Sequence, residues 1–63
     1  MRIYLKEIRE EKNISTRRLS ASSGVARSYI VRIEKGKANP TLDIMCKLAK
    51  ELNVNVHTLF DCD

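Results

Sequence analysis

The segment ARSYIVRIEKG, residues 26–36, combines cationic side chains and a hydroxyl with aliphatic residues at helical spacing. Turned at roughly 100° per residue, a helix over this segment gathers Tyr29, Ile30 and Ile33 on one side. The other side carries long cationic donors, one hydroxyl and one methyl-bearing residue: Arg27, Ser28, Val31, Arg32 and Lys35. Donors of this kind can bind an anion, and equally the face can be an ordinary solvated helix surface.

The segment before it favours the interpretation that this face binds an anion. A short helix is predicted there, capped at its start by Ser15 and ended by Gly24, and the tight turn that follows is typical of a helix-turn-helix. Its first residues, STRR, place hydroxyls and two cations beside free backbone N–H groups that suit a phosphate. Because the positive end of the helix dipole disfavours arginine, a nearby anion explains this choice of residues.

The chain has 63 residues, which predicts one domain over residues 1–63. A chain of this length buries only about 60% of the surface that its unfolded form exposes, which leaves no room for an enclosed substrate pocket. The net charge is +4 and it is uneven: residues 1–37 hold ten Lys and Arg against four Asp and Glu, whereas residues 38–63 hold two against four. A basic front half favours a polyanionic partner, although many soluble domains are basic without one.

Other classes of protein are disfavoured. The start MRIYLKEIREEK is charged at once, so we expect no signal peptide, and no apolar run approaches the roughly 20 residues of a membrane span. Cys46 and Cys62 have no metal-ligand spacing and His57 is the only histidine, so we expect no metal and no other cofactor. No nucleophile is paired with a base, so we expect no enzyme. Reduced thiols in a cytoplasmic protein are the expectation.

The apolar pattern is helical from end to end and predicts an all-α fold of five short helices, with no strand. The first helix is expected over residues 2–12, and Asn13 is suited to the left-handed conformation that ends it. After a polar loop, Thr41 caps a fourth helix whose inward face is predicted to hold Leu42, Met45, Ala49 and Leu52, with Cys46 in the core beside them. Asn53 ends that helix, and Asn55 caps a last one that contains Val56, Leu59 and Phe60.

The run from Ile14 to Phe60 resembles the lambda-repressor/Cro-type helix-turn-helix family, also called XRE. The matching positions cover nearly the whole chain, and their combination is specific: Leu19, Gly24, Val25, Ile30, Ile33, Glu34, Gly36, Asn39, Pro40, Leu48, Ala49, Leu52, Val54 and Leu59. The resemblance implies a compact domain that binds double-stranded DNA with its third helix in the major groove.

For individual residues, the resemblance implies that Arg27, Ser28 and Arg32 reach base edges, where arginine pairs with guanine O6 and N7. Val31 stands where the family often has a small polar residue. Its methyls either contact a thymine methyl or form an ordinary surface. Tyr29 either packs or contacts a phosphate through its hydroxyl.

Contacts to the DNA backbone, which position a protein without reading sequence, are expected from residues at the start of the second helix and around the loop after the third: Thr16, Arg17, Lys35, Lys37 and Asn39. Arg18 either joins them or is solvated. Arg9 and Glu34 match a pair that forms a structural salt bridge in related repressors.

Three positions depart from the family pattern. Ala26 replaces the usual Ser or Thr cap of the third helix, and Arg18 replaces a frequent capping-box Glu. Ser20 replaces a common Ala, and we expect its hydroxyl to bond to a carbonyl one turn earlier. None of these departures is expected to break the fold.

Two functions remain open. The first is a transcriptional repressor that binds a palindromic operator as a homodimer, with recognition helices about 34 Å apart. The second is an antitoxin-like module whose main partner is a protein. Phe60 or Val56 lies either at a dimer surface or inside the monomer. Because the chain ends just after the fifth helix, we expect no separate sensor domain and regulation by a partner protein, by abundance or by operator arrangement.

Overall fold

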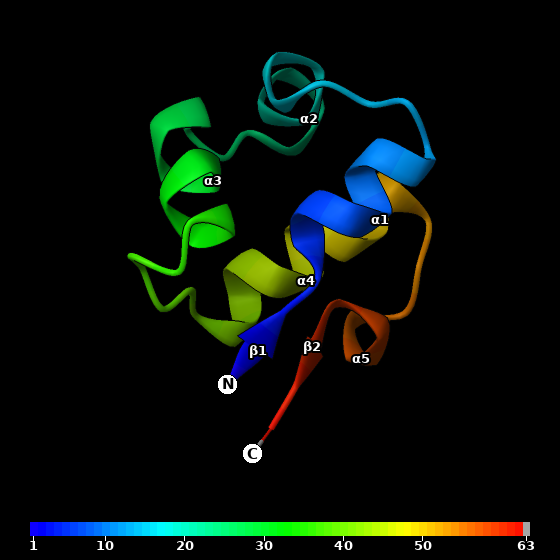
Figure 1. Cartoon of the computed structure of the whole chain (residues 1–63). Coiled ribbons are helices and arrows are strands. Elements are labelled where there is room, and N and C mark those ends of the chain that lie inside the picture. The colour runs from blue at the N-terminus through cyan, green and yellow to red at the C-terminus, as the bar shows by residue number, and fades with distance from the viewer. Residues whose placement is uncertain (63) are drawn as a thin grey trace.

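The computed structural model describes residues 1–62, and over them the expected five helices are present. The elements in chain order are β1 (Arg2–Ile3), α1 (Leu5–Glu11), α2 (Thr16–Ser23), α3 (Arg27–Glu34), α4 (Leu42–Leu52), α5 (Val56–Leu59) and β2 (Phe60–Asp61). In Figure 1, α2 and α3 lie at the end of the molecule opposite the two chain termini. The all-α prediction is therefore confirmed for the body of the domain.

Local side-chain caps begin the helices where the sequence predicts them. Ser15 Oγ accepts a hydrogen bond from Arg18 N at 3.0 Å, and Thr41 Oγ1 accepts one from Ile44 N at 3.2 Å. Asn55 Oδ1 accepts one from His57 N at 3.2 Å. These bonds satisfy N–H groups that have no partner within the helix. Ala26, as expected, provides no side-chain cap for α3.

The ends of the chain differ from the prediction. Arg2 and Ile3 pair antiparallel with Asp61 and Phe60, so the first helix begins at Leu5 and Phe60 lies in a strand, where a helix was expected. The backbone N–H of Tyr4 also donates to Leu59 O at 2.7 Å. A two-residue strand has no period to detect, and its pairing depends on tertiary contact between distant parts of the chain. The expectation of no strand was wrong for this reason.

The Tyr4 side chain reinforces the strand pair. Its hydroxyl donates a 2.6 Å hydrogen bond to Asp61 Oδ2, and this bond raises the pKa of Tyr4. The Arg2 guanidinium carbon lies 5.5 Å from the centroid of the Tyr4 ring, within the range of a cation–π contact. The two ends of the chain are thus joined by main-chain and side-chain bonds.

One hydrophobic core joins all five helices. Its buried members are Leu5, Ile8, Leu19, Val25, Ile30, Ile33, Met45, Leu48, Ala49, Leu52 and Leu59. α2 packs on both α3 and α4, and α4 packs on α5. No helix in residues 1–62 is long and apolar enough to cross a bilayer.

The start of α4 corrects two predictions. Leu42 is 63% exposed and Cys46 is also exposed, although both were expected at the core. The inward face of α4 is instead formed by Met45, Leu48, Ala49 and Leu52. Leu42 and Cys46 are four residues apart, so they share one side of the helix, and that side faces away from the core.

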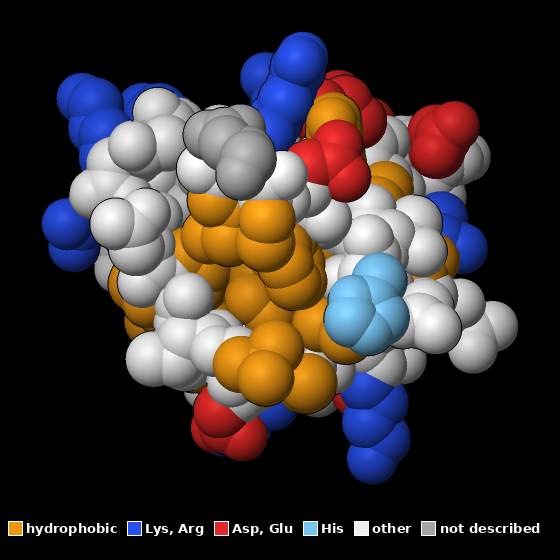
Figure 2. Space-filling view, turned by 90° about the horizontal axis from the view of Figure 1, so that it is seen from below, with side chains coloured by type: hydrophobic (Ala, Val, Ile, Leu, Met, Phe, Trp, Pro, Cys, Tyr) orange, Lys and Arg blue, Asp and Glu red, His pale blue; other side chains and the backbone are white. Residues whose placement is uncertain are grey.

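Apolar side chains also gather at the surface near the chain ends. Figure 2 shows this face, which lies at the end of the molecule that carries β1, β2 and α5. Partly buried residues of these elements pack against the core from this side: Ile3, Val56 and Phe60.

We expect Leu52→Ala and Leu42→Ala to separate the buried and exposed sides of α4. Leu52 is 1% exposed, so its truncation leaves a cavity and should lower the free energy of unfolding by about 3 kcal/mol. Leu42→Ala should change it by less than about 0.5 kcal/mol. Urea unfolding followed by circular dichroism measures both, and equal losses would contradict this placement of α4.

Candidate nucleic-acid interface

The turn between α2 and α3 sets the angle between these two helices. Gly24 adopts φ +77°, a left-handed conformation that a side chain would strain. Ser20 Oγ donates to Val25 O at 2.6 Å, and Ser23 Oγ accepts from Val25 N at 3.2 Å. The backbone N–H and C=O of Val25 are therefore both bonded to side chains of α2.

The Ser20 bond corrects a prediction. The hydroxyl was expected to bond to a carbonyl one turn earlier, but it donates forward to Val25. The reversal at Gly24 brings the Val25 carbonyl back within reach of Ser20, which helical periodicity alone does not reveal. Ser20 thus stabilises the turn of the helix-turn-helix.

Helix α3 is anchored by one side and leaves the other in solvent. Ile30 and Ile33 are 0% and 1% exposed, and Tyr29 is partly buried against the core. Arg27, Ser28, Arg32 and Lys35 are exposed, whereas Val31 is partly buried. The face that the sequence predicts is present, with Val31 less accessible than its polar neighbours.

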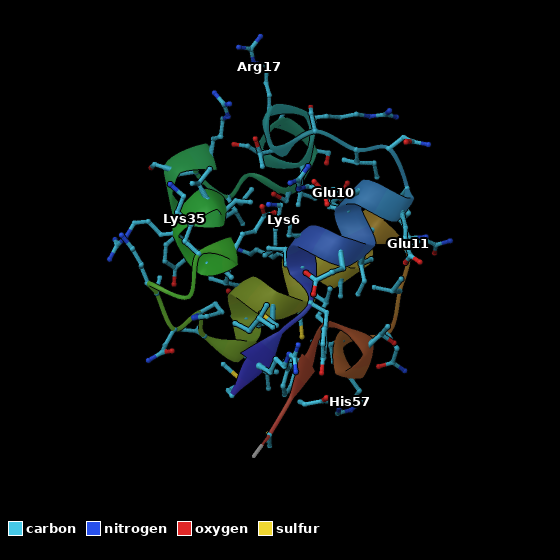
Figure 3. All side chains as sticks on the ribbon, viewed as in Figure 1. Lys6, Glu10, Glu11, Arg17, Lys35 and His57 are labelled. Atoms are coloured by element: carbon cyan, nitrogen blue, oxygen red, sulfur yellow. The ribbon has the colours of Figure 1, made fainter. Side chains whose placement is uncertain are left out.

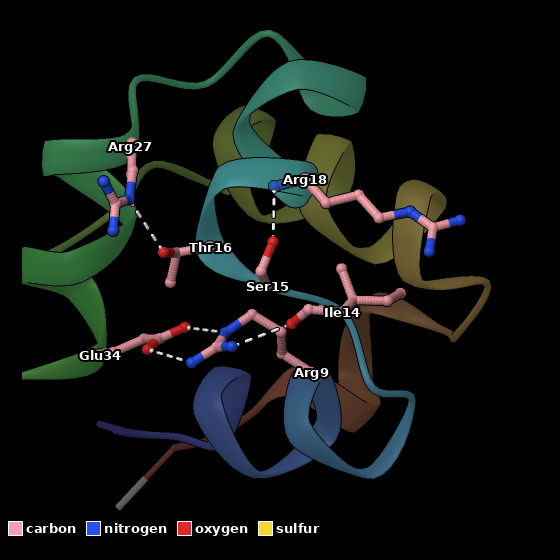
Figure 4. Close-up of polar contacts among 7 residues, drawn as sticks. All are labelled: Arg9, Ile14, Ser15, Thr16, Arg18, Arg27 and Glu34. Carbon is pink, nitrogen blue, oxygen red and sulfur yellow. Dashed lines mark hydrogen bonds and ion pairs between the residues drawn. The ribbon is translucent and has the colours of Figure 1, made fainter.

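Arg27 is held by the start of α2. Its Nε donates to Thr16 Oγ1 at 3.1 Å, which brings together a residue expected at base edges and one expected at a phosphate (Figure 4). Arg18 extends away from Arg27 in the same view. Arg17 also extends away from the body of the domain, as Figure 3 shows. Sequence reasoning missed the Thr16–Arg27 bond, which depends on how close the two helix starts lie.

The loop after α3 begins with a Schellman motif. Lys37 N donates to Arg32 O at 2.9 Å and Gly36 N donates to Ile33 O at 3.1 Å, with Gly36 at φ +73°. Arg32 adds a side-chain bond, because its Nη2 donates to Lys37 O at 3.3 Å. Arg32 was expected at base edges, and its contact with the loop has no signal in the sequence.

Arg9 and Glu34 form the ion pair expected from the resemblance. Arg9 Nε donates to Glu34 Oε2 at 2.8 Å and Nη2 donates to Oε1 at 3.1 Å, with side chains only 11% and 8% exposed. Arg9 Nη1 also donates to Ile14 O at 2.9 Å. The hydrogen bonds to Glu34 raise the pKa of Arg9. Figure 4 shows how this one guanidinium joins α1, the end of α3 and the segment leading into α2.

The candidate surface is uniformly basic. Between Lys12 and Leu42 the sequence contains a single acid, Glu34, and that carboxylate is paired with Arg9. The exposed cations of α2, α3 and the loop therefore face solvent without acidic neighbours from these elements: Arg17, Arg18, Arg27, Arg32, Lys35 and Lys37. Such a surface suits a phosphate backbone. Among residues 1–62 no cluster of His, Cys, Asp and Glu could hold a metal ion.

This fold and turn define a helix-turn-helix domain, and the comparison with known families agrees. A helix-turn-helix family model matches residues 5–59, so the chain belongs to the helix-turn-helix family. It is a DNA-binding transcriptional regulator and not an enzyme. The resemblance to lambda-repressor/Cro-type proteins is thereby confirmed.

Particular relatives support this assignment. An uncharacterised HTH-type transcriptional regulator from Archaeoglobus fulgidus is 38% identical over 63 residues, which cover 100% of this chain and 89% of the relative. The transcriptional regulator SinR of Bacillus subtilis is 40% identical over 58 residues, covering 90% of this chain and 52% of SinR. The chain thus spans about half the length of SinR.

Solved structures show the same fold. SinR in complex with DNA superposes with a TM-score of 0.85 at 40% identity, covering 90% of this chain and 92% of that one. A complex of SinR with SinI gives 0.84 at 40% identity and covers 90% and 56%. The restriction-modification controller protein C.AhdI from Aeromonas hydrophila gives 0.85 at 38% identity and covers 89% and 85%.

We expect Glu34→Gln to lower the free energy of unfolding by about 2–3 kcal/mol, because it leaves the Arg9 guanidinium without its carboxylate in a largely buried position. Lys47→Ala is the matched control. It removes a 3.6 Å ion pair with Asp43 whose side chains are 54% and 79% exposed, so the loss should stay below about 0.5 kcal/mol. Chemical denaturation measures both, and a Glu34→Gln variant as stable as Lys47→Ala would contradict the structural role of the pair.

Proposed function

We propose that this domain, residues 1–63, is a sequence-specific DNA-binding repressor that reads a palindromic operator as a homodimer. The observation that carries the proposal is the outward face of α3. It presents exposed donors on a helix that is anchored by Ile30 and Ile33. A helix of this size fits the major groove, where base pairs are distinguishable by their donors and acceptors.

Base reading is assigned to the start and middle of the face. Arg27 is the strongest candidate, because Thr16 holds its Nε and leaves its two terminal nitrogens for guanine O6 and N7. Ser28 is exposed beside it. Val31 offers a narrower apolar contact for a thymine methyl, since it is partly buried. Arg32 lies on the same face, with its guanidinium bonded to the loop.

Backbone contacts are assigned around this face. The exposed cations Arg17, Lys35 and Lys37 supply charge, and Thr16 and Asn39 supply polar groups at the two ends of the surface. Tyr29 is partly buried, so its ring packs against the core and only its hydroxyl is assigned to a phosphate. These contacts position the domain on DNA without reading sequence.

The second copy is assigned to the apolar face near β1, β2 and α5 (Figure 2). Val56 and Phe60 are partly buried there, so each packs on the core and still offers apolar surface to a partner. This face lies at the end of the molecule opposite α2 and most of α3, which leaves the DNA-binding surface free in a dimer.

A regulatory partner protein is a further part of the proposal. SinR, which shares this fold at 40% identity, has been solved in complex with SinI, and we propose a partner of comparable role for this chain. A regulator of this kind works where the genome is, so we assign it to the cytoplasm.

Selection of bound sites from random duplex DNA tests the function. We expect a palindrome whose half-sites lie one helical turn apart, about 34 Å, and an affinity that falls roughly 10³–10⁵-fold between about 50 and 200 mM salt if 6–10 phosphates are contacted. A single half-site would contradict the dimer. Absence of any enriched sequence would contradict sequence-specific binding.

Arg27→Met and Lys37→Ala should separate base reading from backbone contact. Arg27→Met should remove preference at one base pair of the selected site, a loss of about 1–3 kcal/mol in discrimination. Lys37→Ala should weaken binding to all sequences alike and reduce the salt slope by about 1. Fluorescence anisotropy against single-base variants of the site measures both, and an Arg27→Met protein with unchanged preferences would refute the assignment.

A further inference from the structure

Arg32 lies at one edge of the α3 face, and Arg27 lies at the other. The two residues are five positions apart, which separates their directions by roughly 140° around a helix. Each guanidinium has a different protein partner. Arg27 bonds to Thr16 at the start of α2, whereas Arg32 bonds to the Lys37 carbonyl in the loop after α3.

Arg32 bonds to both backbone polar groups of Lys37. Its N–H donates to Arg32 O at 2.9 Å, and its carbonyl accepts from Arg32 Nη2 at 3.3 Å. In a Schellman motif these two positions commonly share an apolar contact that stabilises the end of the helix. Here both are long cationic residues, so the side-chain hydrogen bond stands in place of that apolar contact.

The charges around the motif point to an anion. Arg32, Lys35 and Lys37 fall within six residues, and the one acid among them, Glu34, is turned to Arg9. Like charges this close repel one another in the free protein. A phosphate beside the loop would relieve that repulsion, and the bond to the Lys37 carbonyl keeps the Arg32 guanidinium at that loop.

We propose that Arg32 is a positioning residue for the phosphate-contacting loop 35–39 and does not read a base edge. Sequence discrimination by α3 then resides in Arg27, Ser28 and Val31, and Arg32 contributes affinity that is the same for every sequence. This inference rests on the proposed DNA-binding function and revises the part of Arg32 within it.

The test compares Arg32→Met with Arg27→Met, because both replace a guanidinium with the same unbranched apolar side chain. In the free proteins, amide hydrogen exchange at Lys37 should become about ten-fold faster in Arg32→Met, the equivalent of one net hydrogen bond, and stay unchanged in Arg27→Met. Unchanged exchange at Lys37 in Arg32→Met would overturn the proposal.

The DNA arm uses single-base variants of the site selected by the wild-type protein. Arg32→Met should weaken binding to all of them by a similar factor, roughly ten-fold, and its effect should be smaller in a Lys37→Ala background because both changes act on the same loop. Loss of preference at one base pair in Arg32→Met would overturn the proposal. Failure of the wild-type protein to select any sequence would instead contradict the proposed function, and the exchange comparison would still decide whether Arg32 holds the loop.

Discussion

The Arg9 guanidinium is the junction on which the geometry of the domain depends. It bonds twice to Glu34 at the end of α3 and once to the Ile14 carbonyl just before α2. A planar group with donors in a fixed fork restrains the direction of its partners as well as their distance. In a domain with a small core, this one side chain therefore limits how α3 can tilt against α1 and α2, and it also removes the single acid from the basic surface.

A few contacts also order the surface of α3. Its apolar residues anchor the helix, and the polar residues at its edges bond to neighbouring segments before any DNA is present. Side chains that are already ordered lose less conformational entropy on binding. The Ser20 bond to the Val25 carbonyl adds to this by stabilising the turn that sets α3 against α2. The residues proposed to contact DNA are thus also held by bonds within the domain.

Much of the fold was predictable because its signals are local. Ser15, Thr41 and Asn55 cap helices through residues two or three positions away, and Gly24 and Asn53 end helices by their own backbone conformation. The strand pair was not predictable, since two residues have no period and their partners lie at the other end of the chain. Leu42 and Cys46 fit a helical face in the sequence, but packing of α4 selected the neighbouring face.

At the candidate site, the outward face of α3 followed from helical periodicity, and the Arg9–Glu34 pair followed from the family resemblance. The bond of Arg27 to Thr16 and the bond of Arg32 to the Lys37 carbonyl could not be predicted in this way. Each depends on how a turn brings separate segments of the chain together.

The most direct test of major-groove reading replaces guanines of the selected site with 7-deazaguanine, which removes the N7 acceptor and leaves the minor groove and the phosphates unchanged. If α3 lies in the major groove, at least one such replacement should weaken binding about ten-fold. Unchanged affinity at every substituted guanine would contradict recognition through Arg27 and the face of α3.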